Sequence, residues 1–220
     1  MEHGKIIINF ARLYYSMKLI RNIATISVVV VALLASGCSN DTDTVLTSQQ
    51  TGIERYLTGS HQPRLIVEDD IGNSLDDEPQ FYTRWGMNIY RYIATYYAEG
   101  RDGWDEVRKG STIEIVYTAY IFNNAAPTIT NMFATNDAES LAKLEEMGLD
   151  AEYEWTTEPM RVKIGSDELL GGLETALKGC REGDSVEVYL TYEAAYGKHY
   201  VGKVPSKSSV VWFVDIVNVE

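Results

Sequence analysis

The chain has 220 residues, of which 45% are hydrophobic and 11% aromatic. This is enough for one domain of ordinary size with extensions, and it argues against a disordered chain. The net charge of −13 should repel nucleic acid and anionic lipid headgroups, so we expect no nucleic-acid partner. The acidic excess lies beyond residue 37, because residues 1–37 hold four basic residues and one acidic residue.

The N-terminal region has the pattern of a bacterial lipoprotein signal. Lys18 and Arg21 supply the positive charges, residues 23–34 form the apolar stretch, and Leu34-Ala35-Ser36-Gly37-Cys38 resembles a lipobox. We therefore expect residues 1–38 to comprise an upstream extension and a signal peptide. Cys38 would be acylated, which predicts a lipid-anchored protein of the bacterial cell envelope, at the outer membrane. The alternative is an uncleaved anchor helix with an incidental cysteine.

Two segments separate this signal from the C-terminal half. Residues 39–50 are polar and predict a flexible tether. Residues 51–108 predict a helical extension, whose main helix ends at residues 100–103. Its apolar side chains recur at helical spacing, and they are Phe81, Trp85, Ile89, Tyr92, Ile93 and Tyr96. Such a stripe packs on the following domain or, alternatively, docks a partner.

The C-terminal half, residues 109–220, begins as strand, helix, strand. Residues 112–122 are strand formers throughout. Residues 137–147 predict a helix that Asp137 caps and Gly148 ends. Residues 160–164 alternate between apolar and polar side chains, as a half-buried strand does.

A short helix is predicted near residues 168–178. One face is apolar, and Ser166 or Asp167 precedes it as a possible cap, with Gly179 at its C-terminal end. A turn at residues 180–184 follows, then the alternating strand 186–190. Tyr192-Glu193-Ala194-Ala195-Tyr196-Gly197 comes next, and residues 210–217 form the last predicted strand.

This order of motifs resembles the FKBP-type peptidyl-prolyl cis-trans isomerases, over roughly Lys109–Glu220. The resemblance implies an α+β fold in which a curved antiparallel sheet wraps around one short helix, here preceded by the helical extension. It implies prolyl isomerisation by non-covalent catalysis in an apolar pocket, without metal or organic cofactor. The implied partners are proline-containing peptides or unfolded exported proteins, together with the membrane through the lipid anchor.

The resemblance also implies the site. Tyr196 matches the tyrosine whose hydroxyl donates to the bound carbonyl, and Tyr117 matches the pocket tyrosine of the first core strand. The remaining substrate-binding positions are Phe133, Met160, Leu169, Leu170, Leu173, Tyr200, Val204 and Trp212. A backbone amide beside Leu169 and Leu170 would bind a substrate carbonyl.

Three departures from the family pattern keep a second function open. Ala134 stands where the family has Asp, Met160 replaces an aromatic wall residue, and Leu173 replaces the pocket-floor Trp. The alternative is therefore a non-catalytic peptide-binding or chaperone module. A carboxylate-based hydrolase is disfavoured because no acidic pair has a defined spacing. Cys180 is expected to be a buried, unpaired thiol without a nucleophilic role.

Overall fold

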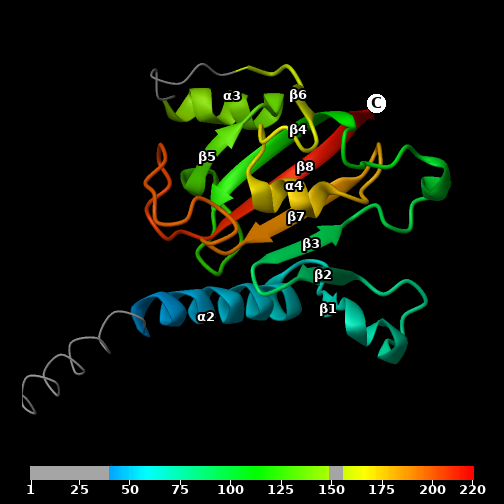
Figure 1. Cartoon of the computed structure of the whole chain (residues 1–220), viewed down its shortest axis with the longest axis horizontal. Coiled ribbons are helices and arrows are strands. Elements are labelled where there is room, and N and C mark those ends of the chain that lie inside the picture. Colours follow the sequence, from blue (N-terminus) through cyan, green and yellow to red (C-terminus); the bar gives the residue numbers. More distant parts are fainter. Residues whose placement is uncertain (1–39, 149–155) are drawn as a thin grey trace, which may run out of the picture. The chain divides into compact units, whose positions relative to one another are not determined.

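The structure is a computed structural model that describes residues 40–148 and 156–220 (Figure 1). The chain divides into two units, Met1–Thr44 and Val45–Glu220, and all packing given below lies within the second. The predicted signal peptide, including Cys38, lies outside the described residues. In the described ranges no helix has both the length and the apolar character needed to cross a membrane.

Eight strands form one sheet in the order β1-β2-β3-β7-β8-β4-β5, with β6 pairing with β4 beside β5. Every pairing is antiparallel except that of β1 with β2. The strands are β1 Ile66–Val67, β2 Phe81–Trp85, β3 Ile89–Ile93, β4 Thr112–Ile121, β5 Met132–Thr135, β6 Met160–Lys163, β7 Ser185–Leu190 and β8 Val210–Val219.

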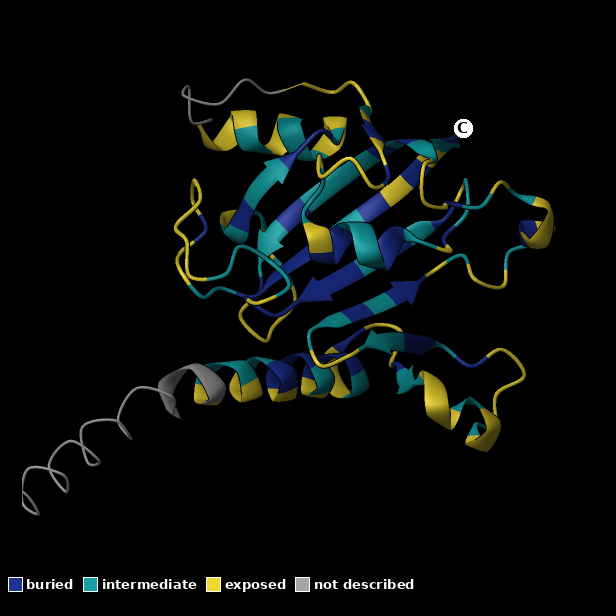
Figure 2. Cartoon of the chain, viewed as in Figure 1, coloured by how far each residue is buried: buried dark blue, intermediate teal, exposed yellow. Residues whose placement is uncertain are grey.

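The helices lie on both faces of this sheet. They are α2 Asn40–Arg55, α3 Ala138–Met147 and α4 Gly171–Leu177, together with the short turns η1 Tyr56–Ser60, η2 Glu68–Asn73, η3 Arg101–Gly103 and η4 Ile129–Asn131. Buried residues of α4 share one core cluster with Val188 of β7, whereas those of α2 share another with Tyr189. Because consecutive strand residues point to opposite faces, α4 and α2 cover opposite faces of the sheet. Figure 2 shows the buried strands between them, and α3 with no buried residue.

The predicted α+β fold with a curved antiparallel sheet and few helices is confirmed, but the predicted helix over residues 81–96 is wrong. That segment is the β2–β3 hairpin, which turns at Gly86 with φ of +58°. We call the core cluster that contains buried residues of α4 the α4-side core, and the one that contains buried residues of α2 the α2-side core. Tyr82, Tyr90 and Tyr92 belong to the α2-side core, while Ile93 belongs to the α4-side core. A strand that is buried on both faces carries apolar residues at successive positions, and these mimicked a helical stripe.

The ends of the predicted helices are partly confirmed. The carboxylate of Asp137 accepts from the N–H of Ser140 at 2.8 Å and caps α3, which ends at Gly148. The predicted cap of α4 is wrong, because Leu170 precedes that helix and no side chain caps it. Gly179 follows α4 with φ of +79°, as predicted. Instead of a tether, residues 40–50 belong to α2.

Candidate functional site

Four aromatic rings from separate segments meet at one point of the α4-side core. Tyr117 comes from β4, Phe133 from β5, Trp212 from β8 and Tyr196 from the loop after β7. The Trp212 ring lies 5.2 Å from that of Tyr117 and 5.8 Å from that of Phe133, between ring centroids. The Phe133 and Tyr196 centroids are 6.0 Å apart, with the rings nearly perpendicular. We call these four side chains the aromatic cluster.

The predicted aliphatic positions lie against the same core. Met160, Leu169 and Leu170 are half-buried and pack on it. Leu173 and Val204 are buried within it, at 0% and 1% exposure. The structure therefore brings nine of the ten predicted residues to one core, where their side chains are buried or half-buried.

Tyr200 is the exception. Its side chain is 72% exposed, and it makes no ring contact with the aromatic cluster in the part of the chain that the structure describes. Tyr200 therefore lies on the surface of the same loop that brings Tyr196 to the cluster.

Helix α4 approaches the Tyr196 loop closely at Gly172. A Cβ atom at this position would lie 2.3 Å from the backbone oxygen of Ala194 and 3.0 Å from its Cβ. Only glycine allows this approach, which accounts for a residue that otherwise weakens the helix. The consequence is that Leu170, at the start of α4, lies close to the segment that carries Tyr196.

Two carboxylates hold the loop between β6 and α4. Glu168 accepts from the N–H of Lys163 at 3.0 Å, and Glu174 accepts from the N–H of Gly165 at 2.9 Å. The N–H of Leu170 has no partner among the described residues. This backbone donor therefore stays available beside the aliphatic side chains.

The polar atoms of the aromatic cluster are protonated and lack partners. Burial, followed by the charge of Tyr117, raises the pKa of Tyr196 to about 12. Burial also raises the pKa of Tyr117. Within the described ranges neither hydroxyl has a hydrogen-bond partner, and the buried Nε1 of Trp212 has none either. Buried donors are rarely left unpaired in folded proteins, so the Nε1 of Trp212 requires an explanation, and the two half-buried hydroxyls beside it are also free to bind a ligand.

Sequence reasoning missed Asn136, which positions Tyr117. The side chain of Asn136 is 2% exposed. Its Oδ1 accepts from the N–H of Tyr117 at 2.7 Å, and its Nδ2 donates to the carbonyl of Ile115 at 3.0 Å and to that of Glu158 at 3.1 Å. These bonds tie β4, the end of β5 and the segment before β6 together. An Asn at the end of a strand carries no sequence signal for this role.

The family's acidic side chain has no replacement in the cluster. Ala134 lies on β5 opposite Ala119 of β4. The nearby carboxylate of Asp137 is used to cap α3. Burial raises the pKa of Tyr117.

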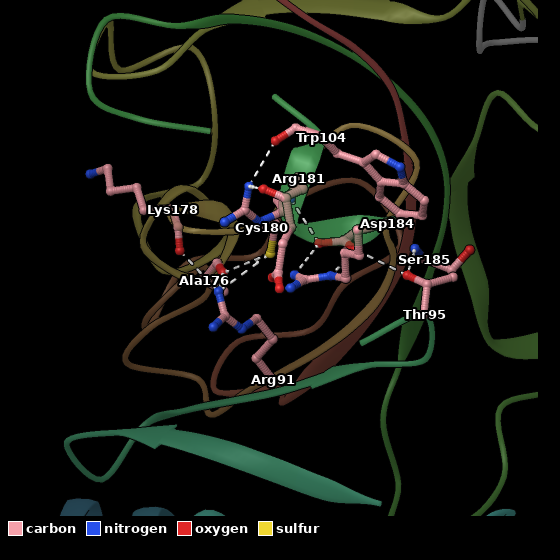
Figure 3. Close-up of polar contacts among 11 residues, drawn as sticks. Arg91, Thr95, Trp104, Ala176, Lys178, Cys180, Arg181, Asp184 and Ser185 are labelled. Atoms are coloured by element: carbon pink, nitrogen blue, oxygen red, sulfur yellow. Dashed lines mark hydrogen bonds and ion pairs between the residues drawn. The ribbon is translucent and has the colours of Figure 1, made fainter. Parts of the chain in front are cut away.

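A second polar group lies at the C-terminal end of α4 (Figure 3). Arg91 donates to the carbonyls of Ala176 and Lys178 at 2.8 and 2.9 Å and to the Cys180 sulfur at 3.3 Å. Cys180 is buried and unpaired, as predicted, and burial raises the pKa of its thiol to about 11. A neutral, inaccessible thiol is a poor nucleophile.

The Asp184 carboxylate completes this group. It is fully buried and binds Arg101 through two hydrogen bonds of 2.7 Å. It also accepts from Thr95 at 3.0 Å and from the N–H of Arg181 at 2.7 Å. A charge pair that is satisfied in this way joins the extension to β7 and leaves no free carboxylate for chemistry. In residues 40–148 and 156–220, no three His, Cys, Asp or Glu side chains are grouped to hold a metal ion.

The sequence and the structure were compared with known proteins. Residues 103–217, just over half of the chain, match the profile of the family described as FKBP-type peptidyl-prolyl cis-trans isomerase. No curated protein matches the sequence. Among solved structures, the N-terminal domain of FKBP42 from Arabidopsis thaliana is similar, with 18% identity and a TM-score of 0.45 over 67% of this chain and 95% of that one. The chain belongs to the family of FKBP-type peptidyl-prolyl cis-trans isomerases.

Proposed function

We propose that the protein accelerates cis-trans isomerisation of peptide bonds that precede proline. The observation that carries this proposal is the aromatic cluster, in which rings from four separate segments meet at the same core against which the half-buried apolar side chains of Met160, Leu169 and Leu170 pack. Apolar walls with a few convergent donors are typical of a site that binds a small apolar group such as a proline ring.

The reaction needs no nucleophile. Rotation about the amide bond has an activation energy of about 20 kcal/mol, because the resonance of the planar amide is lost. An apolar environment favours the twisted amide, which is less polar than the planar ground state, and donors that bind the twisted form lower the barrier further.

The unpartnered donors provide the polar part of this mechanism. The Tyr196 hydroxyl, whose pKa is about 12, remains a neutral donor at physiological pH and would bind a substrate carbonyl. The N–H of Leu170 would bind a second carbonyl. The Nε1 of Trp212 is a third donor with no partner among the described residues. Because it lies in the aromatic cluster, it too would donate to a substrate carbonyl.

The departures from the family pattern favour a modest rate. Ala134 cannot accept a hydrogen bond, and Met160 is more flexible than an aromatic ring. Loss of one hydrogen bond costs about 0.5–1.5 kcal/mol, which corresponds to a rate lower by up to roughly tenfold. The use of Asp137 as a helix cap favours the alternative, a peptide-binding module without turnover.

Exchange NMR on a prolyl peptide distinguishes the two functions. We expect the purified chain to increase the exchange rate measurably and the same peptide to show saturable binding. Binding with the exchange rate at its uncatalysed value would favour the binding module. Neither binding nor acceleration would mean that this chain shares the fold of its family without its function.

The cellular context is a further part of the proposal. The lipobox-like run that ends at Cys38 supports a lipid-anchored protein of the bacterial envelope, at the outer membrane. In that location the substrates would be unfolded exported proteins. Isomerisation of their prolyl bonds takes tens of seconds without catalysis and limits folding.

A further inference from the structure

The loop of residues 191–209, which carries Tyr196, is long and has little secondary structure. It joins β7 to β8. Its internal hydrogen bonds are mostly turn bonds between near neighbours, such as the bond from the N–H of Gly197 to the carbonyl of Tyr192 at 2.7 Å, and a longer-range bond joins the N–H of Lys207 to the carbonyl of Gly197 at 3.0 Å. These bonds shape the loop locally, but the placement of the whole loop against the sheet, and with it the position of Tyr196, also depends on the contacts that hold its two ends.

One side chain of α2 binds both ends. The Oε1 of Gln49 accepts from the N–H of Tyr192 at 2.8 Å, and its Nε2 donates to the carbonyl of Lys207 at 2.8 Å. Tyr192 precedes Tyr196 and Lys207 follows Val204, so a single amide bridges the segment that reaches the core. In Figure 1 this loop is drawn in orange beside the blue helix α2.

A second contact from the extension holds the start of the loop. Asn88, in the β2–β3 turn, binds Thr191 twice, through its backbone carbonyl at 3.0 Å and its Oδ1 at 2.9 Å. Gln50, the residue after Gln49, is 8% exposed and donates to the same Oδ1 at 3.4 Å. The family profile starts at residue 103, so Gln49, Gln50 and Asn88 all lie outside the part of the chain that it matches.

We propose that Gln49 is a positioning residue for prolyl isomerisation: it fixes both ends of the loop and so holds the Tyr196 hydroxyl in its catalytic orientation. This inference rests on the proposed isomerase function. The same loop abuts α4 at Gly172, so a displaced loop would also alter the distance between Tyr196 and Leu170. Small displacements of a positioned donor lower the rate strongly.

The test compares Gln49→Met with Ser48→Ala in the full-length chain. Met keeps the length and the helix propensity of Gln but removes both hydrogen bonds. Ser48 is exposed on the same helix and is absent from the loop contacts, so it is the matched control. For Gln49→Met we expect kcat to fall by about threefold to tenfold, with peptide affinity and the unfolding midpoint close to those of the wild type. Ser48→Ala should have the wild-type kcat.

Two additional measurements separate positioning from a general structural role. Gln49→Glu keeps the acceptor for the Tyr192 N–H but turns a carboxylate oxygen toward the Lys207 carbonyl, which it repels, so its kcat should fall at least as far as that of Gln49→Met. Amide hydrogen exchange should be faster in residues 191–209 of Gln49→Met and unchanged in β8.

Three outcomes would overturn the inference. Gln49→Met with the wild-type kcat refutes this inference alone, because the variant is then fully active without the bridge. Losses of kcat, peptide affinity and stability in parallel show that Gln49 only stabilises the fold. A wild-type chain without activity refutes the proposed function and this inference together.

Discussion

At the level of single residues, the Tyr196 hydroxyl is the group on which turnover should depend. Within the described ranges it has no hydrogen-bond partner, so its removal costs the folded protein little. We expect Tyr196→Phe to lower the isomerisation rate severalfold, because about one hydrogen bond is lost in the transition state. The unfolding midpoint should not change. Tyr97→Phe, which removes a hydroxyl bonded to the Pro79 carbonyl outside the cluster, is the control and should keep the full rate.

The pKa of about 12 for Tyr196 extends this prediction to pH dependence. Because the hydroxyl stays protonated far above neutrality, the rate of the wild type should be constant from about pH 6 to pH 9. A rate that falls with an apparent pKa inside that range would show that another titrating group carries the reaction.

At the level of elements, the approach of α4 to the Tyr196 loop depends on one glycine of an adjacent pair. A Cβ at Gly172 would lie 2.3 Å from the Ala194 oxygen, whereas a Cβ at Gly171 meets nothing within 4 Å. We expect Gly172→Ala to lower the free energy of unfolding by about 1–3 kcal/mol and to reduce the isomerisation rate. Gly171→Ala should raise the free energy of unfolding by about 0.4–1 kcal/mol. Urea titrations of both variants measure these changes, and equal effects would refute the close approach.

The contact between the extension and β7 should depend on pH through His61. This side chain is 3% exposed and its Nε2 lies 2.8 Å from a carboxylate oxygen of Glu187. Burial lowers its pKa, but the hydrogen bond and the charge of Glu187 outweigh this and leave the pKa raised above 6.5. The Pro63 carbonyl, hydrogen-bonded to the Nδ1 of His61, also raises this pKa, and the rings of Tyr56, Tyr92 and Tyr189 face the imidazole.

Because the pKa of His61 is raised in the folded state, protonation favours folding. Its contribution is fully present below about pH 6.5 and is lost as the pH rises through the folded-state pKa. The difference in unfolding free energy between the wild type and His61→Gln should therefore be larger at pH 5.5 than at pH 8.5. Glu187→Gln removes the charge partner and should abolish or reverse this trend. The same difference at both pH values would show that His61 remains neutral.

At the level of the whole molecule, the acidic, folded part follows a basic and apolar N-terminal region. If Cys38 is acylated, two or more chains would anchor the protein stably, whereas one chain binds membranes only marginally. Cys38→Ser should therefore release the protein from the membrane fraction and leave the signal uncleaved, as fractionation and mass spectrometry of the intact chain would show. Unchanged fractionation and unchanged mass would indicate an uncleaved anchor helix instead.

The sequence alone was sufficient to predict the fold of the C-terminal half of the chain. Motifs such as Glu168-Leu169-Leu170-Gly171-Gly172 and Ala195-Tyr196-Gly197 are local, and their order along the chain carries the family resemblance. The ends of α3 at Asp137 and Gly148 were also predictable, because a cap is an interaction between near neighbours in sequence. The positions of Tyr117, Phe133, Tyr196 and Trp212 in one site followed from the resemblance, and the structure brings these rings together.

Only the tertiary structure decided the architecture of the extension and its relation to the site. The apolar residues of the β2–β3 hairpin fit a helical spacing as well as a strand buried on both faces, and the distinction depends on whether β7 offers a free edge for pairing. Likewise, the amide of Gln49 meets Lys207 across 158 positions of sequence. Which distant backbone groups remain unpaired is decided only when the chain folds. The residues around Gln49 in the sequence therefore cannot predict its partners.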